Sequence, residues 1–323
     1  MKFTRLPING ASWNDELLYS FNTEHEEPTT VIVDIINSDT DELIGRQRLI
    51  GVTSGTINIA PYVQNLMHPP RTQPNLNCII AASPSAIAVK VACNGIVSDE
   101  RLFFRAPINN TRVGILSRYV DKQRMVHGGV IALTALATIG IVVEIKALYA
   151  NHTTTERHSL GANGRPMDIA ISVGAEYNDA HTLVVTVICD NAIRRSMTYT
   201  LEKRVLGCRQ LMWYGEGGGI ETYAFQTALK VSDKAHVQSI ATPTHNLNIL
   251  TESITITKLF SSFECNNELE RIAEIIYSPY TFEVVGTSLQ QVELHSREVE
   301  YNKHGSLHQV VVELCEHRRG GER

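Results

Sequence analysis

The chain has 323 residues, which is too long for one ordinary hydrophobic core and predicts two domains or three small ones. Apolar residues make up 43% of the chain and charged residues 20%, which is an ordinary globular composition. The formal net charge of −5 lacks the basic excess that nucleic-acid binding usually requires, so nucleic acid is not an expected partner.

Short β-rich segments separated by turn residues dominate the first two hundred positions. Regular short strands with turn signals between them are typical of β-sandwiches. We therefore predict a mainly β fold, with a first β-sandwich domain at residues 1–108 and a second β-rich domain at residues 109–209. The segments that carry this prediction are residues 29–37, 77–82, 86–95, 101–106, 181–190 and 196–205.

Three further segments complete this half of the chain. Residues 37–45 have the composition of a hairpin connection, and residues 57–67 predict a short helix that begins near a proline. The longest apolar run, Val130–Ile145, is shorter than the ~18 to 20 residues that span a bilayer. A buried pair of strands, or a strand and a short helix, explains this run better, and no membrane partner is expected.

The segment 150–166 is polar, has three glycine or proline residues near its end and shows no hydrophobic periodicity. We expect a long exposed loop, and loops of this length are often functional. Two interpretations stay open. The segment is either a contact arm that carries Arg157 and His158, or a solvated connection between strands.

The segment Trp213–Phe225, WYGEGGGIETYAF, joins two aromatics, three glycines and a strand-like alternation of aromatics. Glycines adopt positive φ without steric cost and let another backbone or a partner approach closely, whereas large aromatics prefer burial. We interpret this segment as a junction that docks something. The candidate interface residues are Trp213, Tyr214, Gly217, Gly218, Gly219, Tyr223 and Phe225, together with Arg157 and His158.

The pattern changes after this junction. Residues 266–278 predict a helix, with an asparagine at its start and Glu268 in its first turn. Its apolar face is formed by Leu269, Ile272, Ala273 and Ile276. Strand-like segments precede and follow this helix. We therefore predict a small α+β domain at residues 210–323.

Sequence motifs of catalysis are weak. The GEGGG turn lacks the lysine and hydroxyl of a phosphate-binding loop, and a strand follows it instead of a helix. Glu216 and Glu221 resemble a sugar-cleaving carboxylate pair, but glutamates in a polar turn are expected to be exposed to solvent. His304 and His308 flank a glycine turn and need not converge with Cys315 on a metal. We predict no catalytic residue, no cofactor and no metal.

Six cysteines lie far apart without a CxxC pair, and several have apolar neighbours. We expect reduced, buried thiols. Residues 1–13 lack the continuous apolar segment of a secretory signal peptide. Together these features favour assembly in a reducing cytoplasm.

The junction WYGEGGGIETYAF and the later segment LERIAEIIYSPYTFEV resemble structural proteins from the tail and neck modules of tailed bacteriophages that infect gut Bacteroidetes, including the crAss-like group. The segments PINGASWNDELLYSF and GTINIAPYVQNLM add a looser similarity. The resemblance implies a noncatalytic virion subunit, in the tail or neck, that is assembled in the bacterial cytoplasm. It also implies a homo-oligomeric ring around a tail or a head-to-tail connector, in contact with other virion proteins.

Two rival functions belong to other classes. A carbohydrate-binding or adhesin module would use exposed Trp213, Tyr214 and Tyr223 to stack on sugars. A glycoside hydrolase would use Glu216 and Glu221.

Overall fold

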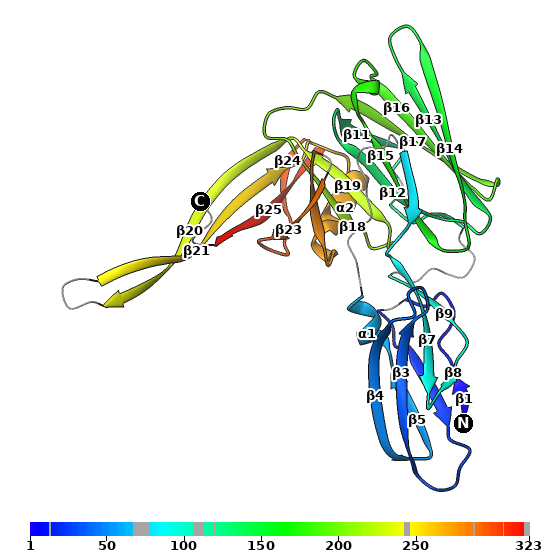
Figure 1. Ribbon diagram of the computed structural model, residues 1–323. Helices are drawn as coiled ribbons and strands as arrows, with labels where there is room; N and C mark the ends of the chain where they lie inside the picture. The colour runs from blue at the N-terminus through cyan, green and yellow to red at the C-terminus, as the bar shows by residue number, and fades with distance from the viewer. Residues whose placement is uncertain are drawn as a thin grey trace.

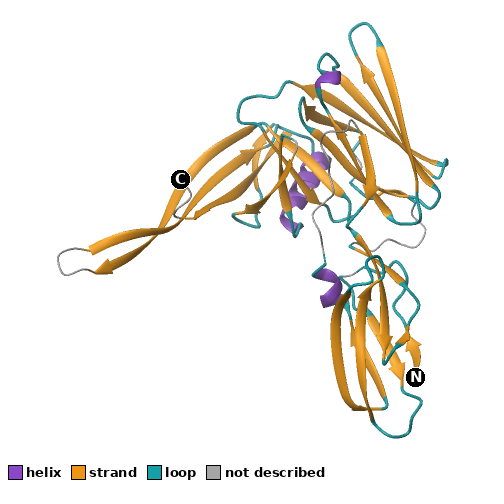
Figure 2. Cartoon of the chain, viewed as in Figure 1, coloured by secondary structure: helices purple, strands orange, loops and turns teal. Residues whose placement is uncertain are grey.

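The computed structural model describes residues 1–12, 14–66, 78–105, 113–118, 120–241, 246–286, 288–305 and 307–319. The chain forms three β-rich bodies (Figure 1). Helices are few and short, as Figure 2 shows. The fold is mainly β, with two tandem β-sandwiches followed by an α+β body, as the spacing of strand-like segments predicted.

The first sandwich packs a three-stranded sheet against a five-stranded one around a core that includes Tyr19, Val33, Ile35 and Phe103. Alternate residues of its strands are buried, because one face of each sheet meets the core. The short helix α1 (Ala60–Gln64) confirms the helix predicted near a proline. The three-stranded sheet has the order β1 (Lys2–Arg5), β2 (Leu18–Asn22), β5 (Ser54–Asn58). The five-stranded sheet has the order β4 (Leu43–Val52), β3 (Thr29–Asn37), β7 (Ala86–Cys93), β8 (Ile96–Val97), and β9 (Arg101–Phe104) also pairs with β7.

The second sandwich has a four-stranded and a five-stranded sheet. The apolar run Val130–Ile145 forms strand β12 (Val130–Leu136) and most of strand β13 (Gly140–Leu148), one in each sheet, which confirms the first of its two interpretations. The short helix η1 (Ala175–Tyr177) precedes β16. The four-stranded sheet has the order β10 (Gly114–Ile115), β12 (Val130–Leu136), β15 (Pro166–Ser172), β6 (Cys78–Ala82). The five-stranded sheet has the order β11 (Lys122–Val126), β17 (Ile193–Glu202), β16 (Thr182–Cys189), β13 (Gly140–Leu148), β14 (Thr153–Gly161).

The chain crosses between the two sandwiches more than once. Strand β6 lies within the sequence range expected for the first domain, but it pairs with β15 in the second sandwich. The chain then returns to the first sandwich as β7 to β9. The boundary expected at residue 108 therefore does not separate two independent bodies, because residues 78–82 belong to a sheet of the second sandwich.

The loop expected at residues 150–166 is wrong for most of its length. Residues 153–161 form the edge strand β14, which pairs in register with β13 at nine positions. Most of its side chains are exposed, since an edge strand has solvent around it and needs no apolar alternation. The absence of hydrophobic periodicity therefore concealed a strand.

The C-terminal body combines one large, strongly curved sheet with the helix α2 (Asn266–Ala273) and the adjoining 3-10 turn η2 (Glu274–Tyr277). Leu269, Ile272 and Ile275 pack in one core with Leu259 and Leu314 from the sheet. Its strands are β18 (Arg209–Tyr214), β19 (Ile220–Phe225), β20 (Thr227–Ala241), β21 (Asn246–Phe260), β22 (Thr281–Val285), β23 (Ser288–Leu294), β24 (Glu300–His304) and β25 (Leu307–Arg319).

Candidate assembly interface

The aromatic residues of the junction are buried inside the chain. Trp213 and Phe225 belong to the core of the C-terminal body, and Tyr214 packs with Val130 and Ala132 of the second sandwich. The guanidinium of Arg105 lies 5.0 Å from the centre of the Tyr214 ring. Strand β18 is buried on both faces, because α2 and its sheet cover one side and the second sandwich covers the other.

This burial corrects two expectations. The side chains of Trp213, Tyr214, Tyr223 and Phe225 are each at most 2% exposed, so they pack within one chain and cannot contact a second copy in this fold. Stacking of Trp213, Tyr214 and Tyr223 on a sugar is excluded for the same reason. Sequence alone could not separate a junction within the chain from one between chains.

Two of the three glycines, Gly217 and Gly219, let another backbone approach closely, as the sequence predicted, but that backbone belongs to the second sandwich. Gly218 has a φ of +80°. A Cβ added at Gly217 would lie 2.4 Å from the Leu116 carbonyl oxygen, and one added at Gly219 would lie 2.4 Å from the Ser117 nitrogen. The Ser117 hydroxyl also donates to the Ile220 carbonyl at 2.7 Å. The glycine turn is therefore the point where residues 116–117 dock on the C-terminal body.

Replacing Gly219 by alanine is expected to lower the free energy of unfolding by about 1–3 kcal/mol, because the neighbour that must move is backbone. Gly161→Ala is the matched control, since its added Cβ would meet only the Ile139 carbonyl oxygen at 4.0 Å. Urea unfolding of both variants checks this prediction. Equal stability of the two variants would contradict close packing at the turn.

A buried ionic network lies beneath the glycine turn. The Arg271 guanidinium donates to Glu268 at 2.5 and 3.0 Å and to Glu221 at 3.0 Å, and Arg271 and both glutamates are almost fully buried. Arg118 of the second sandwich donates its backbone N–H to Glu221, and its guanidinium pairs with Glu274 at 2.8 Å. The network therefore fastens the second sandwich to α2 and η2.

Burial raises the pKa of Glu221 to about 7, against the opposing effect of the Arg271 charge. Burial alone would lower the pKa of Arg271, but the charges of Glu268 and Glu221 outweigh it and raise that pKa. We expected both Glu216 and Glu221 in solvent, and only Glu216 is exposed. Glu221 is held by Arg271 and by the Arg118 amide, which leaves it poorly placed to act on a sugar with Glu216.

A second buried acid lies where the second sandwich meets the C-terminal body. Asp168 on β15 is 4% exposed and accepts a 2.7 Å hydrogen bond from the Thr134 hydroxyl. The same hydroxyl accepts the Ile220 N–H at 2.9 Å. Burial raises the pKa of Asp168 to about 6, and hydrogen bonds from Ser83 and Thr134 partly oppose this rise.

Arg157 and His158 lie away from the junction, on the edge strand β14. Arg157 is exposed, with its guanidinium nitrogen 3.9 Å from Glu144, and His158 is half-buried with Nε2 3.6 Å from Glu156. No described strand pairs with the outer edge of β14. The structure therefore keeps these two candidate contact residues on a free sheet edge.

Two hydrogen bonds determine which backbone groups of β14 are open. The Tyr149 N–H donates to the His152 carbonyl at 3.0 Å, and the Ala162 N–H donates to the Ile139 carbonyl at 2.9 Å, just outside the two ends of the ladder. Hydrogen-bonded pairs alternate along an antiparallel ladder, so the even-numbered residues of β14 bond to β13. The residues whose backbone groups face the open edge are Thr153, Thr155, Arg157, Ser159 and Gly161.

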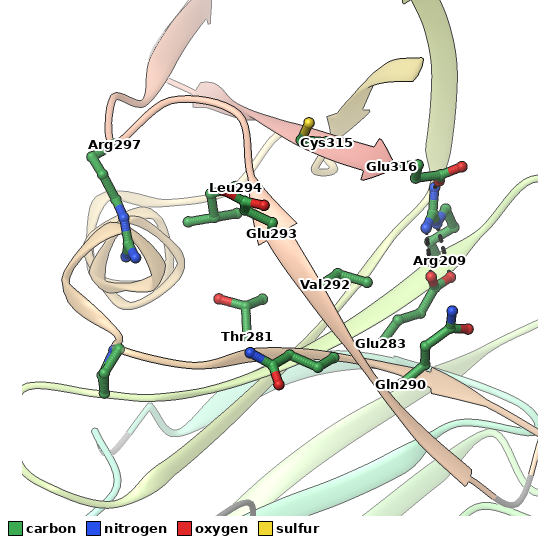
Figure 3. A pocket seen from close by; sticks show the side chains of 12 residues that line it. Arg209, Thr281, Glu283, Gln290, Val292, Glu293, Leu294, Arg297, Cys315 and Glu316 are labelled. Atoms are coloured by element: carbon green, nitrogen blue, oxygen red, sulfur yellow. Dashed lines mark hydrogen bonds and ion pairs between the residues drawn. The ribbon is translucent and has the colours of Figure 1, made fainter. Parts of the chain in front are cut away.

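A groove of about 810 Å³ lies in the C-terminal body where β23 separates from β25 (Figure 3). The two strands pair only at Glu293 with Cys315 and at Leu294 with Leu314. At the far end of the groove, Arg209 donates to Glu283 and to Glu316. The charged groups at that end therefore bind one another already.

The described residues show no metal site, and they do show the state of the cysteines and the character of the helices. Among the residues whose side chains are described, no three His, Cys, Asp or Glu residues come together as metal ligands. The six cysteines are free, and four are buried, but Cys78 is partly exposed and Cys265 is exposed, contrary to the expectation of buried thiols. None of the described helices has the length and apolar character needed to cross a membrane.

Comparison with known proteins finds no family model and no curated protein that matches the chain. Weakly similar solved structures include trypsin-activated alpha-2-macroglobulin from Escherichia coli, at 8% identity and a TM-score of 0.21, over 80% of this chain and 25% of that one. Another is the complex of Dpr2 Ig1-Ig2 with DIP-Theta Ig1-Ig3, at 8% identity and a TM-score of 0.18, over 97% and 88% of the two chains. The chain spans about a quarter of the macroglobulin. These similarities are too distant to indicate a function, and the resemblance to phage proteins stays a prediction.

Proposed function

We propose that this chain is a noncatalytic structural subunit of a bacteriophage virion, which forms a homo-oligomeric ring in the tail or the head-to-tail connector. One observation carries the homo-oligomer: β14 is a long, regular sheet edge whose outward backbone groups have no partner among the described residues. The placement in a virion rests on the sequence resemblance at the junction and at α2.

An open edge of this kind favours pairing with another chain. Natural proteins protect their edge strands with prolines, bulges or charged side chains; β14 has no proline and no register shift in its ladder with β13, and its charged residues are Glu156 and Arg157. The exposed edge β4 differs, because its ladder with β3 has two register shifts. Strand β14 is therefore the better edge for a subunit contact, with Arg157 at its centre.

Thr155→Pro is expected to abolish self-assembly while the monomer stays folded. Proline removes the outward N–H of Thr155, and that N–H takes no part in the ladder with β13. Thr155→Val is the control, because valine keeps the N–H and suits a strand. The mass of the native assembly, measured by light scattering across a concentration series, should fall to that of one chain only for the proline variant.

Two results would contradict the proposal. The unmodified protein could remain a monomer at every concentration and bind no other virion protein, which would exclude the ring. Purified phage particles could also lack the chain when their proteins are identified by mass spectrometry, which would exclude the virion. A circular dichroism spectrum equal to that of the unmodified protein shows that Thr155→Pro still folds.

A further inference from the structure

The outer face of the five-stranded sheet in the second sandwich carries exposed basic side chains. Strands β13, β16 and β17 bury every second residue in the core, and the residues between them point outward. We define the basic face as the outward residues of this sheet around its four exposed cations. These cations are Lys122 on β11, Lys146 on β13, Arg157 on β14 and Arg194 on β17.

The charges of the basic face are only partly neutralised. Arg157 and Arg194 share one carboxylate, Glu144, at 3.9 and 3.1 Å. Among the described residues, no ion pair involves Lys122 or Lys146. The four cations and Glu144 give the face a net charge of +3, whereas the whole chain has a net charge of −5. The rest of the chain is therefore acidic, and the face is suited to an acidic partner.

The border of the face with the C-terminal body is already neutralised. Arg124 on β11 pairs with Glu202 at 3.4 Å and lies 3.8 Å from Glu264. These three residues bind one another across the junction of the two bodies. The part of the face that is open to a partner therefore lies toward β13 and β14.

An acidic loop lies at the end of the first sandwich. It consists of residues 23–28, which connect β2 to β3. Glu26 and Glu27 are exposed, and neither forms an ion pair with another described residue. Glu24 differs, because its carboxylate pairs with the amino group of Met1 at 2.6 Å. Two unpaired carboxylates therefore remain for a basic surface.

The acidic loop and the basic face of one chain cannot meet. Strand β3 begins at Thr29, just after the loop, and ends at Asn37. Close to that other end, Asp39 pairs with Arg165 of the second sandwich. At about 3.4 Å per residue, β3 separates its two ends by roughly 27 Å. Figure 1 shows the end of the first sandwich that carries the loop pointing away from the second sandwich.

Apolar side chains accompany the charges on both surfaces. Ile32 on β3 and Ile50 on β4 lie beside the acidic loop, and they are 40% and 72% exposed. On the basic face, Val142, Val184 and Ile188 point outward between the cations and are half-buried. Exposed ion pairs contribute little each, so burial of these aliphatic groups is the larger source of affinity.

We propose that the end of the first sandwich that carries the acidic loop docks on the basic face of the next copy. The contact joins two different patches, as a closed ring requires. It is continuous with the β14 edge, because Arg157 belongs to both. Opposite charges direct the encounter and fix its orientation. This inference rests on the proposed homo-oligomer and names the second surface of its contact, and the partner is a second copy of this chain.

Two charge-reversal variants test this contact. The face variant combines Lys122→Glu with Lys146→Glu, and the loop variant combines Glu26→Lys with Glu27→Lys. Each is expected to weaken self-association about tenfold or more, because facing charges become alike. The matched control combines Arg5→Glu with Lys303→Glu, which changes the net charge as the face variant does at exposed positions away from both surfaces. The control is expected to assemble like the unmodified chain.

An equimolar mixture of the face and loop variants is expected to regain assembly. The acidic face of one variant receives the basic loop of the other, and the basic face of the second receives the acidic loop of the first. Light scattering after size exclusion measures the masses, and thermal unfolding shows that each variant folds.

Three results would overturn this inference. The face variant could assemble like the unmodified chain, which would leave the homo-oligomer in place; if it also lost the retention on immobilised dextran sulfate that the unmodified chain shows, the face would belong to an anionic polymer instead. Both variants could stay monomeric when mixed. A monomeric unmodified chain would contradict the proposed homo-oligomer as well.

Discussion

Replacing Arg271 by methionine is expected to lower the free energy of unfolding by about 3–5 kcal/mol, because it leaves Glu221 and Glu268 buried without their counter-charge. Arg271 is also the donor to the Thr222 carbonyl at 2.9 Å, and that acceptor loses this hydrogen bond as well. No other described residue bonds to both carboxylates, so the loss is not compensated locally.

A triple variant separates the loss of the pair from the loss of packing. Arg271→Met with Glu221→Gln and Glu268→Gln removes all three charges and is expected to recover a large part of the stability, since replacing a whole buried ion cluster is often neutral. Urea unfolding, followed by Trp213 fluorescence in a Trp13→Phe background, reports on the body that contains the network. A loss below about 1 kcal/mol in Arg271→Met would mean that water reaches the two carboxylates.

The stability of the chain is expected to rise as the pH falls from about 8 to about 4 through the titration of Asp168. Its pKa in the folded state is about 6, against 3.8 for the unperturbed group, so the folded state binds the proton first. A carboxyl whose pKa is raised by folding costs stability when it is charged in both states. Over this pH range the contribution of Asp168 is about 2–3 kcal/mol.

The Asp168→Asn variant isolates that contribution, because asparagine keeps an oxygen acceptor for the Thr134 hydroxyl and does not titrate. The difference in unfolding free energy between this variant and the unmodified chain should favour the variant most at pH 8 and should shrink toward pH 4. Parallel pH profiles of the two proteins would show that Asp168 keeps its ordinary pKa in the folded chain.

The fold could be predicted from sequence wherever a strand has one buried face. Residues 29–37 alternate buried and more exposed positions, and both ends of strand β3 agree with the expected segment. Strand β14 lacked this signal because both its faces are largely exposed. Edge strands with two exposed faces are therefore the strands that hydrophobic periodicity misses.

The candidate site was harder to predict for a different reason. The glycines Gly217 and Gly219 correctly indicated a close backbone approach, since only absent side chains permit it. Nothing in one sequence says whether the approaching backbone belongs to the same chain. The burial of Glu221 depends on Arg271, fifty residues later, and no local pattern links the two.

The pairing of β6 with a strand of the second sandwich affects how the chain folds during synthesis. During synthesis on the ribosome, residues 78–82 emerge long before β15, the strand that will pair with them. The first sandwich can fold with β7 to β9 in place while this short apolar segment still has no strand to pair with. A fragment that ends at residue 108 lacks β15, so residues 78–82 have no strand to pair with. Premature termination there should therefore give a chain that aggregates.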